Sequence, residues 1–159
     1  MTRTTKSNKP FEENLSDFSN YIINKPYISE TGGIQITVWP EFIDSKSSAI
    51  GDLFIWAYHV RIDNQSLEGI KLVSRYWRII DEKGIIQEVT GEGVIGEQPI
   101  IDAGKSFQYS SGVHLRHPSG IMTGTYRVLK TGINSDKEAF DVKIPTFSLD
   151  VPSIKSVIN

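Results

Sequence analysis

Apolar and polar residues alternate along most of the chain from residue 34 onward. The pattern is clearest at 54–62, where every second residue is apolar: Phe54, Trp56, Tyr58, Val60 and Ile62. Because successive side chains of a β-strand point to opposite faces, this pattern predicts a strand with one face in the core. Shorter stretches of the same kind predict further strands at 34–38, 70–80, 85–90, 106–112, 123–129 and 140–151.

Three details of these strands are predicted from single residues. In the 70–80 strand, Val73, Trp77 and Ile79 are expected to share the core face. Residues 81–84 have the composition of a hairpin turn, with Gly84 where a positive φ is needed. Pro145 is expected to interrupt the last strand, because proline has no N–H to donate to a neighbouring strand.

About seven or eight such strands, with turn residues roughly every ten positions and no helix between them, predict an all-β protein. The expected architecture is an antiparallel β-sandwich of two sheets. A closed barrel is the alternative, since periodicity does not separate the two.

A different pattern precedes the strands. Four apolar residues follow helical spacing: Phe11, Leu15, Phe18 and Ile22. They predict a short amphipathic helix at about 10–23, after a disordered polar lead at 1–9. A helix of this length is marginal alone in water, so it is expected to dock on the body of the protein or, less favourably, on a partner. The predicted organisation is an N-terminal extension, 1–26, and a sandwich domain, 27–159.

Composition narrows the classes of partner. The formal net charge is −2 and the pI is about 5.9, with Lys and Arg scattered along the chain. Neither nucleic acid nor an anionic membrane is therefore an expected partner. The chain has no cysteine, which excludes disulfides and thiolate metal sites, and no apolar run of membrane-spanning length. Without a signal-like apolar segment, we expect a soluble cytoplasmic protein.

The glycines Gly91, Gly93 and Gly96 have the G-x-G-x-x-G spacing of a phosphate-binding loop. That loop requires a helix starting at the third glycine, and Pro99 leaves no room for one. Acidic residues also outnumber Lys105 nearby. We therefore expect these glycines to supply positive φ, a bulge or close strand approach. Binding of a small anion such as pyrophosphate by their amides is the alternative.

No catalytic or metal-binding group stands out. His114 and His117 would lie on opposite faces of an extended chain, and His59 is in another predicted strand. Ser111 lacks the G-x-S-x-G context of a hydrolase nucleophile. Arg75, among aromatic residues, suits either stacking on a ligand or packing across a sheet surface. We expect no enzymatic activity, no cofactor and no metal ligands.

The chain resembles the ApaG family in the order and spacing of G-x-G-V-x-G-x-Q-P, Y-x-S-G and G-x-M-x-G-x-Y. The matching segments, within about 27–152, are FIWAYHVRIDN (54–64), LVSRYWRIID (72–81), EVTGEGVIGEQP (88–99), AGKSFQYSSG (103–112), PSGIMTGTY (118–126) and FDVKIPTFSL (140–149). The basic HLRH stretch at 114–117 and the N-terminal helix depart from the family pattern.

The resemblance implies a fibronectin-type-III-like sandwich without established enzymatic activity. It implies a link to cobalt tolerance and magnesium efflux, a protein-interaction role and a suggested pyrophosphate site at Gly91, Gly93 and Gly96. We therefore predict a non-enzymatic binding module for an unidentified protein partner, with a homodimer as one form of that interaction. Anion binding at residues 91–96 is the alternative function.

Overall fold

The computed structural model describes residues 4–5, 25–132 and 138–152. The helix predicted at about 10–23 lies outside these residues and stays a prediction. Within the described ranges the chain forms strands and one short 3₁₀ turn, η2 (Asp44–Lys46). The strands are β1 (Thr4–Thr5), β2 (Tyr27–Thr31), β3 (Ile34–Phe42), β4 (Phe54–Asn64), β5 (Ile70–Asp81), β6 (Ile86–Glu92), β7 (Ile100–Ile101), β8 (Ser106–Leu115), β9 (Ser119–Lys130) and β10 (Ala139–Asp150).

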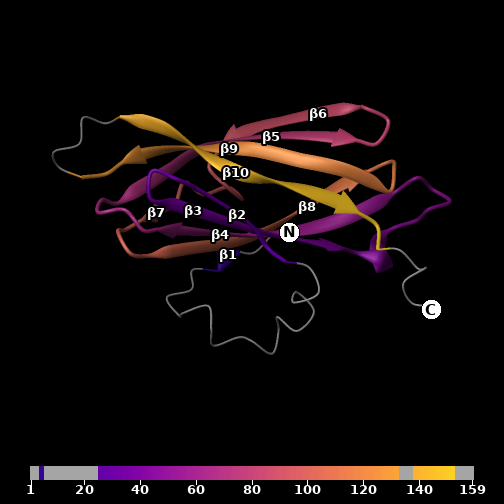
Figure 1. Ribbon diagram of the computed structural model, residues 1–159, viewed down its shortest axis with the longest axis horizontal. Coiled ribbons are helices and arrows are strands. Elements are labelled where there is room, and N and C mark those ends of the chain that lie inside the picture. The colour runs from indigo at the N-terminus through magenta and orange to yellow at the C-terminus, as the bar shows by residue number, and fades with distance from the viewer. Residues whose placement is uncertain (1–3, 6–24, 133–137, 153–159) are drawn as a thin grey trace.

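These strands form two antiparallel sheets that stack face to face (Figure 1). One sheet has the order β1-β8-β4-β3-β2, and the other has the order β10-β9-β5-β6, with β7 pairing on β5. The predicted β-sandwich is thereby confirmed, rather than the barrel. Within the described ranges, no helix has the length and apolar character that a membrane crossing requires.

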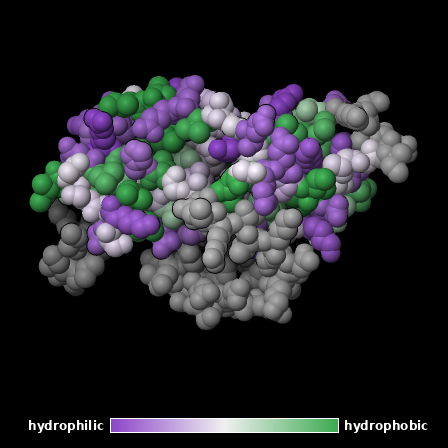
Figure 2. All heavy atoms as spheres, turned by 180° about the vertical axis from the view of Figure 1, so that it is seen from behind, coloured by the Kyte–Doolittle hydropathy of each residue, from purple (hydrophilic) through white to green (hydrophobic). Residues whose placement is uncertain are grey.

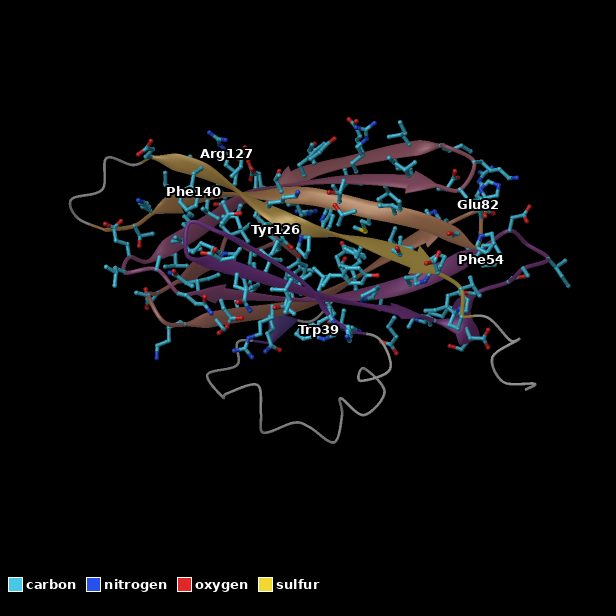
Figure 3. The ribbon with its side chains drawn as sticks, in the orientation of Figure 1. Trp39, Phe54, Glu82, Tyr126, Arg127 and Phe140 are labelled. Atoms are coloured by element: carbon cyan, nitrogen blue, oxygen red, sulfur yellow. The ribbon has the colours of Figure 1, made fainter. Side chains whose placement is uncertain are left out.

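Alternation along the strands places the apolar side chains between the sheets. Trp56, Trp77, Tyr126 and Phe147 are at most 1% exposed. The Trp77 ring meets the Tyr126 and Phe147 rings edge to face, with centroids 6.2 and 6.0 Å away, an arrangement that favours aromatic pairs. Figure 3 shows Tyr126 between the sheets and its neighbour Arg127 on the outer side. The predicted core face of 54–62 is confirmed, with Phe54 at its half-buried end.

One polar contact crosses this core. The hydroxyls of Tyr109 on β8 and Tyr126 on β9 are hydrogen-bonded to each other. Burial raises the pKa of both side chains far above the ordinary tyrosine value, because a phenolate would lose its hydration there. The pair therefore joins the two sheets as neutral hydroxyls.

Several expectations about local structure need correction. Val73 does not share the core face, because a bulge between Leu72 and Ser74 shifts the alternation and leaves Val73 half-buried. Thr4–Thr5 pair with β8, although residues 1–9 were expected to be disordered. The sequence patterns also did not predict β2 or β7. The hairpin turn at 81–84 is confirmed, with Gly84 at φ 79°, and the interruption at Pro145 is a bulge within one continuous strand.

Candidate binding cleft beside strand β6

The first glycine of the motif makes room for an arginine. Arg75 and Gly91 are directly opposite each other in the β5–β6 pair. A β-carbon at Gly91 would lie 2.8 Å from Nη1 of Arg75. This Nη1 donates hydrogen bonds to the carbonyls of Glu92 and Gly93, at 3.0 and 2.9 Å. The guanidinium therefore extends across β6 at the one position of that strand pair where no side chain blocks it.

The other two glycines shape the turn that follows β6. Gly93 has φ 57°, and a β-carbon on it would lie 1.8 Å from the carbonyl oxygen of Glu97. Ile95 and Gly96, at φ 46° and 73°, occupy the two central positions of a turn between Val94 and Glu97. Positive φ at both positions is typical of a type I′ hairpin turn. The expected positive φ and close approach are thus present in this segment.

The backbone amides of this turn already have acceptors. The Gly93 N–H donates to the carbonyl of Val73 at 2.7 Å. The Val94 and Glu97 amides donate to each other's carbonyls at 2.8 and 3.0 Å. In the described part of the chain the next element is the short strand β7, not a helix. Gly91 therefore lies in strand β6, Gly93 and Gly96 lie in the tight turn that follows it, and the Gly93, Val94 and Glu97 amides are directed at protein carbonyls.

The two long sides of the sandwich differ. On one side, β10 and β2 are neighbours: Ser29 Oγ donates to the carbonyl of Lys143 at 2.6 Å, and the Lys143 amide donates to Thr31 Oγ1 at 3.2 Å. On the other side, β6 ends its sheet and no described strand pairs with its outer edge. In an antiparallel pair, alternate residues of an edge strand direct their N–H and C=O groups outward. The side at β6 is thus the open one.

Strand β6 is also exposed along its length. Ile86 and Val89 are 49% and 42% exposed, and no residue of the strand is fully buried. On the face shown in Figure 2, apolar side chains are interspersed with polar ones rather than gathered in one broad patch. The feature that distinguishes this part of the surface is a strand edge with apolar side chains beside it.

A cleft of about 260 Å³ lies between the β5–β6 pair and β8. Register places the side chains of Arg75, Trp77 and Ile79 on the inner face of the pair, opposite Gly91, Val89 and Gln87. The opposite wall includes Ser111, Val113 and His114 of β8. This cleft opens beside the free edge of β6.

The cleft is lined by a cation and by no carboxylate. Its lining contains Arg75 and His114 and no Asp or Glu. Among the described residues, Arg75 has no carboxylate partner; its Nη1 donates to the main-chain carbonyls of Glu92 and Gly93. The buried indole N–H of Trp77 has no hydrogen-bond acceptor in the described structure. Glu88 pairs with Arg78 in the strand register and lies on the outer face, away from the cleft.

Tyr58 forms part of the floor of this cleft. Burial raises the pKa of Tyr58, and a hydrogen bond with Ser111 and the positive charge of Arg75 partly oppose that rise. The side chain therefore presents a neutral hydroxyl at neutral pH.

A second cavity, of about 420 Å³, lies where the ends of β2, β3 and β10 meet, lined by aromatic and proline residues that include Phe42 and Trp56. It contains one cation and one anion, Lys25 and Asp150. Its charges are thus balanced, unlike those of the cleft beside β6.

The histidines occupy three separate places. His117 Nδ1 donates to Asp81 Oδ2 at 2.9 Å, and His114 lines the cleft. His59 Nδ1 lies 2.6 Å from Ser110 Oγ, and His59 Nε2 lies 2.9 Å from Glu41 Oε2. The spacing of these three residues in the sequence did not reveal this cluster. Its residues line neither cavity described above. In the described ranges no group of three or more His, Asp or Glu is placed to hold a metal ion.

Asp81 organises the hairpin before β6. Burial acts to raise the pKa of this carboxyl, but hydrogen bonds from the Ile85 amide, His117 and the Lys83 amide together lower it below the ordinary aspartate value. Hydrogen bonds to the charged form of a carboxylate have this effect. The ionised side chain thus holds the turn from which β6 starts.

A family model described as the ApaG domain matches residues 44–130. Protein ApaG of Methylocella silvestris is 49% identical over 133 residues, covering 84% of this chain and 99% of that relative. The chain belongs to the ApaG family. Protein ApaG of Rhodospirillum centenum is 45% identical over 130 residues, covering 82% of this chain and 97% of the relative.

Among solved structures, an ApaA protein from Bordetella pertussis has the same fold, with a TM-score of 0.71 and 34% sequence identity. It covers 80% of this chain and 97% of its own. The ApaG-domain match at 44–130 contains every residue that lines the cleft beside β6. The cleft is therefore lined entirely by residues of this chain's ApaG domain.

Proposed function

We propose that this ApaG protein is a non-enzymatic, cytoplasmic binding module that takes an extended segment of a partner protein onto the free edge of β6. The observation that carries the proposal is the difference between the two long sides of the sandwich. At Lys143 the edge of β10 is bonded to Ser29 and Thr31 of β2, whereas the outer edge of β6 has no described strand beside it.

Strand addition to an open edge is a recurring mode of peptide recognition. Main-chain hydrogen bonds supply affinity, and pockets that take alternate side chains supply selectivity. β6 provides both, because its edge groups point outward and its inner face adjoins the cleft. About half of its seven residues would offer main-chain bonds. At roughly 1 kcal/mol net for each bond, with added apolar contact, affinities in the micromolar range are expected.

The absence of enzymatic activity is part of the same proposal. The Ser110, His59 and Glu41 contacts resemble the order of a catalytic triad. A triad also needs a substrate pocket and positioned donors for the oxyanion, and these residues line neither described cavity. We expect purified protein to hydrolyse p-nitrophenyl acetate at the same rate with and without Ser110→Ala. A hydroxyl-dependent rate would refute this part.

Family resemblance implies a link to cobalt tolerance and magnesium efflux. We assign this link to the bound partner. The protein would affect divalent-cation traffic by engaging another protein. Isothermal titration with cobalt or magnesium chloride tests this assignment: saturable binding by the protein alone would contradict it.

The binding mode is tested by site-specific photo-crosslinking in cells. A benzophenone side chain replaces Ile86 on β6 in one variant and Ile28 on β2 in the matched control; both isoleucines are exposed residues of edge strands. We expect discrete crosslinked species from position 86 and none from position 28. Crosslinks of equal yield at both positions, or at neither, would overturn the assignment. Light scattering then distinguishes a homodimer from a complex with a different protein.

A further inference from the structure

The charge and shape of the cleft identify the chemistry of the segment that β6 would take. We infer that the partner segment is an acidic peptide, with a carboxylate side chain that binds Arg75 and apolar side chains two and four residues away. This inference rests on the proposed strand addition and specifies which peptide segments β6 would select.

The first observation is the space beside Gly91. A strand added to β6 would lie about 4.8 Å from it, and its side chains would alternate between the cleft and the outer face. Opposite Gly91, such a strand meets no side chain from β6, and the guanidinium of Arg75 lies over this position. A carboxylate entering there would reach a cation that has no carboxylate partner among the described residues.

The second observation is the volume of the cleft. At about 260 Å³ the cleft is smaller than typical sites for drug-sized ligands, which are roughly 300–1,000 Å³. It suits one or two peptide side chains better than a nucleotide. The inner residues that precede Gly91 along β6 are Val89 and Gln87, which lie opposite Trp77 and Ile79 of β5. Apolar side chains are therefore expected next to Val89 and Gln87, which gives the pattern acidic-x-apolar-x-apolar for a segment that runs antiparallel to β6.

The third observation is the location of the protein's own acidic groups. The lining of the cleft contains no carboxylate, and Glu88, the acidic residue in the middle of β6, faces the other way beside Arg78. A peptide carboxylate in the cleft would thus meet a cation without a facing anion from the wall. Charge-assisted hydrogen bonds to Arg are among the stronger contacts in proteins.

The test uses the full chain and synthetic peptides in NMR titrations. The probe is acetyl-TETVTVT-amide, and the matched control acetyl-TQTVTVT-amide differs only in the carboxylate. We expect shifts of the amides of residues 86–92, and an affinity about ten- to a hundredfold higher for the Glu peptide. Arg75→Gln should remove that preference, whereas Arg78→Gln, on the other face of the same strand, should retain it.

Arg75→Gln also loses the bonds to Glu92 and Gly93, so a second variant keeps the inference testable if it folds poorly. Ser111→Glu places a negative charge on the opposite wall and removes neither the donor nor the acceptors of those bonds. It should weaken binding of the Glu peptide more than that of the Gln peptide. An unchanged preference in a folded Ser111→Glu variant would count against the inference.

The remaining outcomes separate the two proposals. Equal affinity for both peptides, with shifts at 86–92, overturns the acidic selectivity and leaves strand addition standing. No shift at 86–92 with either peptide overturns both. If sodium acetate alone reproduces the shifts and displaces the Glu peptide at equal concentration, the cleft is a site for free anions and the peptide inference is wrong.

Discussion

Replacing Gly93 by alanine tests the account of the glycine motif most directly. A β-carbon at this position would lie 1.8 Å from the Glu97 carbonyl oxygen and 2.6 Å from the carbonyl carbon. Both are main-chain atoms of the tight turn, so no side chain can rotate to make room. The turn must open, which breaks the paired hydrogen bonds between Val94 and Glu97.

The expected loss can be worked out from two contributions. An alanine held at φ 57° is less favourable than glycine by about 1–2 kcal/mol. Losing two hydrogen bonds removes about 0.5–1.5 kcal/mol each. Gly93→Ala should therefore lower the free energy of unfolding by roughly 2–5 kcal/mol. Gly96→Ala is the matched control: its φ is 73°, but nothing lies within 4 Å of its β-carbon, so only the first contribution, about 1–2 kcal/mol, applies.

Urea unfolding followed by tryptophan fluorescence gives both values, read as shifts in midpoint at constant slope. We expect the loss at Gly93 to exceed that at Gly96 by about 1–3 kcal/mol, the contribution of the two hydrogen bonds. Equal losses at the two positions would show that the close approach of Gly93 to Glu97 does not constrain the turn. The geometric explanation of the motif would then fail.

Three further outcomes are expected. Because Asp81 has a lowered pKa when folded, its stabilisation should be full above the ordinary value of about 3.9 and be lost as pH falls below it; Asp81→Asn should remove this step from acid-unfolding curves. Tyr109→Phe should cost about 1–3 kcal/mol in urea unfolding by leaving the Tyr126 hydroxyl unpaired, and replacing both tyrosines by Phe should cost less than the sum of the single changes. Millimolar pyrophosphate should leave the NMR amide shifts of residues 91–96 unchanged; saturable shifts there would revive the alternative function.

The fold was predictable because apolar and polar residues alternate along the core strands. Trp56, Tyr58, Val60 and Ile62 are buried as their period-two spacing predicts. A side chain's face depends only on its position in the strand, so one sequence suffices for this inference. The sandwich was predicted correctly because the patterns of many separate strands all indicate this one architecture.

The features that the sequence did not predict depend on contacts between residues that are far apart in the chain. The bulge that displaces Val73 is defined by the pairing of β5 with β9, which no local pattern records. The meeting of Arg75 with Gly91 likewise depends on the β5–β6 register. With that register, the glycine spacing could have been recognised as space for an arginine. Without it, Arg75 was one cation among aromatic residues, and the cleft could not be located.

The lack of any buried side chain in β6 has a consequence for how the molecule fluctuates. Segments with few buried contacts undergo local opening at far lower free energy than the core of a domain. Amide hydrogens of β6 should therefore exchange with deuterium sooner than those of β4 and β9, whose alternate residues are buried. A strand that detaches briefly while the rest stays intact can adjust its twist to an incoming chain, so reversible capture need not disturb the body of the protein.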